Sequence, residues 1–156
     1  MGVRVRGELT EVRPATEDDV DLLVAWHADP DVARYWDGET FTPSEMRARL
    51  ARPDVDAYIV EAGGAPVGYL QAWTEGTGGG LDMFLIPAAR GRGLGPDAAR
   101  ALASALREEG WTRITVDPYV WNETAIRAWQ RAGFNAIERR PAGGEHTADW
   151  LLMEFG

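Results

Sequence analysis

The stretch ARGRGLGPD at residues 89–97 alternates glycines with arginines and then reaches a proline and an aspartate. An apolar run that ends at Pro87 precedes it, and an alanine- and leucine-rich segment from residue 96 follows it. Because glycine has no Cβ, successive backbone N–H groups can converge there, and a helix start adds partial positive charge. The stretch is therefore predicted to hold an anion, with phosphate as the expected ligand. The alternative is a glycine-rich helix start whose arginines are only solvated.

The segments around this stretch predict one α/β domain, of the α+β type, over residues 1–156. Two strand-like runs at 57–75 are joined by Gly-Gly, which is a hairpin signal, and GTGGG at 76–80 is interpreted as a loop. Helices are predicted over 16–29, 42–52, 96–109 and 122–133, and further strands over 8–15, 81–87, 112–118, 134–140 and 146–155. This order predicts an antiparallel front followed by two β-to-α crossovers.

The composition excludes several classes of enzyme. All 16 basic residues are arginine, so Schiff-base chemistry and lysine-dependent phosphate sites are ruled out. The absence of cysteine removes thiol catalysis and cysteine-ligated metals. With two serines and two histidines in the chain, a Ser-His-Asp triad is not expected. His27 and His146 lack metal-like spacing, so no metal is expected, and both are interpreted as structural or surface residues.

The charge of the chain is acidic but unevenly distributed. A formal net charge of −9 argues against a nucleic-acid partner. Residues 17–62 carry twelve carboxylates and four arginines, whereas residues 82–140 carry seven carboxylates and nine arginines. One part therefore suits a cation and the other tolerates an anion. No apolar run approaches a membrane span, and the first ten residues lack the apolar core of a signal peptide, so a cytoplasmic protein without membrane contact is expected.

A second pattern lies in DPYVWNETAIRAWQRAGF at residues 117–134, where a predicted helix begins after Asn122 and ends at Gly-Phe. Together with RGRGLG, it resembles the GNAT superfamily of acetyl-CoA-dependent N-acetyltransferases. The family pattern N-x-x-A-x-x-x-Y-x-x-x-G-F is matched except at its tyrosine, where this chain has Trp129. The resemblance spans essentially the whole chain. It implies the GNAT fold, in which helices flank a central mixed and mostly antiparallel sheet.

The resemblance also implies where acetyl-CoA binds. The family loop Q/R-x-x-G-x-G/A is matched within the glycine stretch, so the pyrophosphate is expected at Arg90, Gly91, Arg92, Gly93, Leu94, Gly95 and Asp97, with Pro96 lacking an N–H. The strand backbone around Phe84 and Ile86 is expected to pair with pantetheine and to hold the thioester carbonyl. Asn122 is expected to bond the pantetheine arm, and the small Ala125 to let the cofactor pass close to its helix.

Three local stretches are similar to aminoglycoside 6′-N-acetyltransferases: VARYWDGET at 32–40, GLDMFLIP at 80–87 and VDPYVWN at 116–122. The resemblance implies an acceptor amine on a small polycation. In this interpretation Asp82 accepts the proton of the attacking ammonium, and it is the predicted catalytic residue. The remaining substrate-binding residues are predicted to be Trp36, Glu39, Trp73 and Asp117, with the carboxylates gripping other ammonium groups and the indoles forming flat walls.

Other interpretations of the same residues remain open. One is an N-acyltransferase of siderophore precursors, and another is an acetyltransferase of protein amines. A third, from a different class, is an acyl-CoA-binding sensor that transfers nothing. Each predicted site residue also has a structural reading, because Asp82 suits a solvated strand, Asp117 can cap the turn before a proline, and Trp36 suits the core. The oligomeric state is expected to be a monomer or a homodimer.

Overall fold

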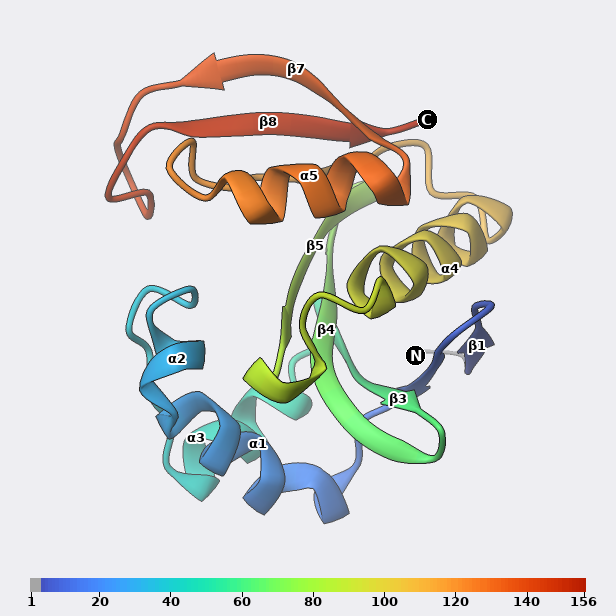
Figure 1. The fold of residues 1–156 in the computed structure, drawn as a ribbon, viewed down its shortest axis with the longest axis vertical. Coiled ribbons are helices and arrows are strands. Elements are labelled where there is room, and N and C mark those ends of the chain that lie inside the picture. The colour runs from blue at the N-terminus through green and yellow to red at the C-terminus, as the bar shows by residue number, and fades with distance from the viewer. Residues whose placement is uncertain (1–3) are drawn as a thin grey trace.

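The computed structural model describes residues 4–156, which form an eight-stranded sheet flanked by helices (Figure 1). The strands lie in the order β1-β2-β3-β4-β5-β6-β8-β7. Their bounds are β1 (Val5–Arg6), β2 (Glu11–Pro14), β3 (Val55–Ala62), β4 (Ala65–Glu75), β5 (Gly78–Leu85), β6 (Ile114–Val116), β7 (Phe134–Arg140) and β8 (Trp150–Phe155). Every neighbouring pair is antiparallel except β5 and β6. The predicted mixed, mostly antiparallel sheet is confirmed.

The helices lie between strands as the sequence predicts, with one addition. Their bounds are α1 (Val20–Ala28), α2 (Pro30–Ala33), α3 (Pro43–Leu50), α4 (Leu94–Glu108) and α5 (Glu123–Ala132), and α2 was not predicted. Helix α4 connects the parallel strands β5 and β6. Helix α5 connects β6 to β7, which run in the same direction because both are antiparallel to the intervening β8. Both predicted crossovers are therefore confirmed.

Two apolar clusters cover opposite faces of the central strands. One contains the inner face of α4, with Ala98, Leu102 and Leu106, packed on the sheet. The other packs α1 and α3 against Ile59, Tyr69 and Phe84. Because β3 and β4 are covered on both faces, they read as nearly continuous apolar runs rather than as an alternating pattern. No helix among residues 4–156 has the length and apolar character needed to cross a bilayer. The predicted domain also included residues 1–3, which lie outside the described range.

The glycine-rich segment at 76–80 is not simply a loop, because β5 begins at Gly78. Gly79 and Gly80 pair with Thr74 and Trp73 of β4 on one side and with β6 on the other. A Cβ on Gly79 would overlap the backbone oxygen of Trp73, and one on Gly80 would overlap the Trp73 indole. Glycine here permits close approach of neighbouring strands, so its loop-like composition misled the prediction.

Strands β5 and β6 separate after a short contact. Their pairing is limited to Gly79 with Ile114 and Gly80 with Thr115. From Leu81 to Leu85, β5 pairs with β4 but has no strand partner on its other side among residues 4–156. Figure 1 shows the result: α1, α2 and α3 gather near one end of β5, whereas α5, β7 and β8 lie near the other. The edge of β5 is therefore open in the middle of the sheet.

Helix α4 begins at Leu94, two residues earlier than predicted. The side chain of Asp97, in the first turn of this helix, anchors the turn at residues 7–10 near the start of the chain, called the N-terminal turn below. The Asp97 carboxylate accepts hydrogen bonds from the backbone N–H groups of Glu8, Leu9 and Thr10, at 2.9–3.0 Å, and from the Thr10 hydroxyl at 2.7 Å. A Cβ on Gly7 would overlap this carboxylate. Residues almost ninety positions apart are thus joined by one side chain.

We expect Asp97→Ala to lower the free energy of unfolding by about 2–3 kcal/mol, because it leaves several backbone donors without their charged acceptor. Urea unfolding followed by circular dichroism measures this difference. The matched control is Glu108→Ala, which removes an exposed carboxylate from the other end of the same helix and should change stability little. Equal stability of the two variants would contradict an anchoring role for Asp97.

Candidate functional site

A pocket of about 660 Å³ opens where β5 and β6 separate. It is lined by residues from the segment after α2, from the strands β3 to β6, from α5 and from the turn before β8. Five of the predicted site residues on the acceptor side line it: Trp36, Glu39, Trp73, Asp82 and Asp117. Two residues predicted for the cofactor, Asn122 and Ala125, line it as well, together with Trp129. The fold therefore brings together residues from distant parts of the sequence.

Asp82 lies half-buried on β5, opposite Gln71 of β4. The Gln71 Nε2 donates to the Asp82 carboxylate at 3.0 Å. The Gln71 Oε1 accepts from the Tyr69 hydroxyl at 2.7 Å and from Arg49 Nη1 at 3.4 Å. With two donors on its oxygen, the amide can turn only its nitrogen toward Asp82. The orientation of the carboxylate is therefore fixed by a chain of side chains from β4 and α3.

The surroundings of Asp82 favour its protonated form. Burial, followed by the negative charges of Asp117 and Glu145, raises the pKa of Asp82 to about 7, against the opposing effects of Gln71 and Arg49. Desolvation disfavours the ionised carboxylate, and nearby like charges act in the same direction. A carboxyl group with this pKa exchanges its proton near neutral pH. It is therefore suited to general acid–base chemistry.

Asp117 follows β6 and pairs with His146, a residue that the sequence analysis did not assign to the site. His146 Nε2 lies 2.8 Å from Asp117 Oδ2, and the His146 ring stacks on Trp150 at a centroid distance of 4.1 Å. The hydrogen-bonded turn between Gly143 and His146 folds this segment back beside the end of β6. Sequence spacing carries no signal for such a pairing, since the two residues meet through the β7–β8 turn.

The other histidine is structural, as predicted. His27 is fully buried among the rings of Trp36, Phe41 and Phe84, and its Nδ1 lies 2.7 Å from the Leu23 carbonyl oxygen. Burial lowers the pKa of His27, which favours the neutral imidazole. Trp36 takes part in this aromatic cluster and also lines the pocket. The predicted choice between core and pocket wall therefore does not apply to Trp36, which belongs to both.

The glycine stretch forms a bend with unpaired amides at its end. Gly91 and Gly93 have φ values of 76° and 75°, a left-handed conformation that favours glycine. The N–H groups of Leu94 and Gly95, in the first turn of α4, have no preceding helical carbonyl to bond. Arg92 is exposed beside them. These features fit a phosphate group, because the donors and the helix dipole point to the same place.

Two predicted members of this stretch have their polar groups engaged within the protein. The Arg90 guanidinium donates to the carbonyl oxygens of Leu85 and Asp31, at 3.1 and 2.9 Å, and lies over the Tyr35 ring. The Asp97 amide donates to the Gly93 carbonyl oxygen at 3.3 Å. The acidic side chain of Asp97 is directed to the N-terminal turn. The groups of the glycine stretch that remain for a phosphate are therefore the backbone N–H donors and the exposed side chain of Arg92.

Of the remaining residues predicted for the cofactor, Asn122 caps a helix, and Phe84 and Ile86 were predicted to act through their backbone groups. Asn122 caps α5, with its Oδ1 accepting from the Ala125 N–H at 3.2 Å, and its side-chain amide group retains its donors. The Phe84 side chain is buried in the core, and the Ile86 N–H bonds to Val67 of β4. The side chain of Phe84 is therefore not available to a ligand, and its predicted role concerns its backbone alone.

Comparisons with known proteins agree with this arrangement. The family model of the acetyltransferase (GNAT) domain matches residues 10–135. The chain is 32% identical to aminoglycoside N(6′)-acetyltransferase type 1 of Klebsiella pneumoniae over 145 residues, which cover 79% of this chain and 72% of the relative. A relative of the same name from Serratia marcescens matches equally.

Solved structures extend the similarity to three dimensions. AAC(6′)-Ib in complex with ribostamycin and coenzyme A superposes with a TM-score of 0.78 at 28% identity, covering 95% of this chain and 93% of that one. The same enzyme has been solved with acetyl-CoA, with a TM-score of 0.78 at 27% identity and the same coverage. A ribosomal L7/L12 alpha-N-protein acetyltransferase shares the fold, with a TM-score of 0.84 at 15% identity over 97% of each chain.

The predicted family, fold and cofactor are therefore confirmed, since the family model covers most of the chain and its structural neighbours hold acetyl-CoA or coenzyme A. The chain belongs to the GNAT superfamily, and it is an acetyl-CoA-dependent N-acetyltransferase.

Proposed function

We propose that the chain acetylates a primary amine of a polycationic small molecule, and that this amine is the 6′-amine of an aminoglycoside. The observation that carries the proposal is the concentration of carboxylates around Asp82, in a pocket at the open edge of β5. A cation is attracted to such a pocket, and multiple carboxylates select for multiple ammonium groups. The similarity to aminoglycoside N(6′)-acetyltransferases supports the same acceptor class.

In this proposal Asp82 is the general base. An alkylammonium with a pKa of about 10.4 must lose its proton before its nitrogen can attack a thioester carbonyl. The Asp82 carboxylate takes that proton, directly or through water, and Gln71 holds the carboxylate in place. The acceptor nitrogen then forms its bond to the acetyl carbon and loses its second proton to water, while the carbon–sulfur bond breaks and coenzyme A leaves as a thiolate.

The other pocket residues are assigned to binding. Asp117 and Glu39 hold further ammonium groups of the acceptor, and Trp36 and Trp73 provide apolar surfaces for sugar rings. Acetyl-CoA supplies the activated acetyl group. The backbone donors from Arg92 to Gly95 hold its pyrophosphate, while Asn122 and the small Ala125 line the path of the pantetheine arm. The open edge of β5 offers the backbone groups of Met83 and Leu85, on either side of Phe84, to the same arm.

The proposed acceptor is tested by measuring thiol release from acetyl-CoA with a panel of amines. We expect turnover with kanamycin- or ribostamycin-like acceptors and little with hydroxylysine-type amines or N-terminal peptides, with mass spectrometry locating the acetyl group on the 6′-amine. Asp82→Asn should lower turnover by about 10²–10⁴, the usual contribution of a general base, while coenzyme A still binds. Turnover confined to peptides, or an Asp82→Asn variant as active as the parent, would refute the proposal.

The pH dependence of kcat/KM tests the role of Gln71. Since Asp82 acts in its ionised form and its pKa is about 7, activity should fall as pH decreases through 7 and level off above it. The Gln71 hydrogen bond lowers this pKa, so Gln71→Leu should move the acidic limb to higher pH, by up to about one pH unit for a single hydrogen bond. Gln130→Leu, an exposed position outside the pocket, is the matched control and should leave the limb unchanged.

Trp129 occupies the position where the family pattern has a tyrosine. An indole N–H donates a hydrogen bond but does not titrate, so Trp129 cannot act as a general acid. Trp129 is 7% exposed, packs edge-to-face on Phe134 and lines the pocket. We expect Trp129→Phe to keep most of the turnover, because a thiolate whose thiol has a pKa of about 8.5 leaves without a proton. Thiol-release kinetics check this, with Trp111→Phe controlling for the loss of indole packing outside the pocket.

A collapse of turnover in Trp129→Phe with intact acetyl-CoA affinity would overturn this interpretation. It would show that the indole N–H takes part in the chemical step.

A further inference from the structure

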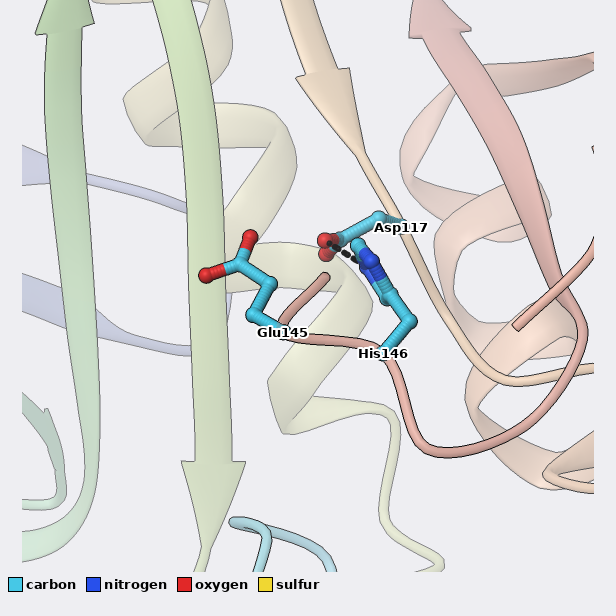
Figure 2. Close-up of side chains that lie close together, drawn as sticks. All are labelled: Asp117, Glu145 and His146. Atoms are coloured by element: carbon cyan, nitrogen blue, oxygen red, sulfur yellow. Dashed lines mark hydrogen bonds and ion pairs between the residues drawn. The ribbon is translucent and has the colours of Figure 1, made fainter. Parts of the chain in front are cut away.

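Three side chains of types that can bind a metal ion lie close together at one side of the pocket. Figure 2 shows Asp117 at the end of β6 and Glu145 with His146 on the turn that precedes β8. One ligand atom from each residue lies within 4.8 Å of the other two. We propose that Asp117, Glu145 and His146 form a binding site for a divalent transition-metal ion of the zinc class.

The nitrogen ligand of this cluster is held in place before any ion binds. The His146 ring stacks on Trp150 with an interplanar angle of 10°, and its side chain is 13% exposed. This packing directs Nε2 at the Asp117 carboxylate, 2.8 Å away. A metal ion would replace the proton between these two atoms, and with bonds of about 2.0–2.2 Å to each it would move the Asp117 carboxylate off the Nε2 axis. The stacked ring keeps its place, so it loses little conformational entropy on binding.

The charges of the cluster favour a cation. Asp117 and Glu145 are two carboxylates at short range, and like charges at such a distance repel each other. His146 is the ion-pair partner found for Asp117, and Glu145 has no salt bridge among residues 4–156. No arginine therefore neutralises this pair within the described chain. The Glu145 side chain is exposed, so its carboxylate can adjust to an ion without disturbing the core.

The donor set identifies the class of ion. Magnesium and calcium prefer oxygen ligands throughout, whereas an imidazole nitrogen suits zinc, nickel, cobalt and copper. Three protein ligands leave at least one coordination position open, as in zinc sites that also bind water or a ligand.

Occupancy of this site has a consequence for the pocket that rests on the proposed function. Asp117 is assigned there to an ammonium group of the acceptor, and a metal ion would occupy the same oxygens. Neutralising Asp117 and Glu145 would also remove two of the charges that raise the pKa of Asp82. A bound ion is therefore expected to compete with the amine and not with acetyl-CoA.

The site is tested by calorimetric titration of the tag-free protein with ZnCl₂, in the absence of both acetyl-CoA and any amine. We expect one zinc ion per chain, and no binding of MgCl₂ under the same conditions. Since neither substrate is present, the result does not depend on the acceptor proposed above. Absence of zinc binding up to about 1 mM, the range of the weakest specific sites, would overturn the proposal.

Two variants separate this cluster from adventitious binding elsewhere. His146→Phe keeps an aromatic ring against Trp150 but removes the nitrogen ligand, and Glu145→Gln changes an exposed side chain that is unimportant for folding. Each should weaken zinc binding by about tenfold or more. Glu75→Gln, which removes an exposed carboxylate from another wall of the same pocket, should leave it unchanged. Parent-like affinity in Glu145→Gln refutes the assignment even if the His146 variant does not fold.

Discussion

The separation of β5 from β6 is the constraint on which the rest of the molecule depends. The two strands pair at Gly79 and Gly80 and nowhere beyond, so the backbone of β5 from Leu81 onward faces an opening. That opening contains the pocket, and it leaves Asp82 on a strand that is rigidly paired on one side. Unpaired backbone groups in a sheet are costly unless something bonds them. The sheet is therefore incomplete along this edge, and in the proposal above an extended cofactor arm would bond where the missing strand would.

The glycines at the junction make this geometry possible. Gly79 and Gly80 let β4, β5 and β6 approach more closely than any side chain would allow, and the Trp73 indole lies over Gly80. The strands can then diverge within a few residues. The same tight contact places Trp73 along the pocket wall next to Asp82. Composition alone suggested a loop, whereas these glycines let three backbones approach closely.

Local patterns in the sequence predicted the helices and most of the strands, but they could not predict contacts between residues far apart in the chain. The helix positions and the Gly-Gly hairpin each follow from neighbouring residues. Some contacts join parts of the chain whose approach only the fold determines. Examples are the hydrogen bonds of Asp97 to residues 8–10 and the pair of Asp117 with His146. Similarity to a family supplied the position of Asp82, but not Gln71, whose role depends on strand register. The acidic segment at 17–62 contributes Arg49 and Arg52 to the pocket as well as Glu39.

The hydrogen bonds of Asp97 link the turn at residues 7–10 to the first turn of α4, and the two regions also share an apolar cluster that contains Val12 and Ala98. The Asp97 carboxylate holds the backbone of residues 8–10, and its helical turn presents the amides of the glycine stretch. Order in one region therefore favours order in the other, and the two form linked equilibria. Linkage is reciprocal, so a pyrophosphate held by the glycine stretch, as proposed, would also favour the ordered turn at residues 7–10, which lies against that stretch. The N-terminal turn thus forms part of the wall beside the proposed pyrophosphate site.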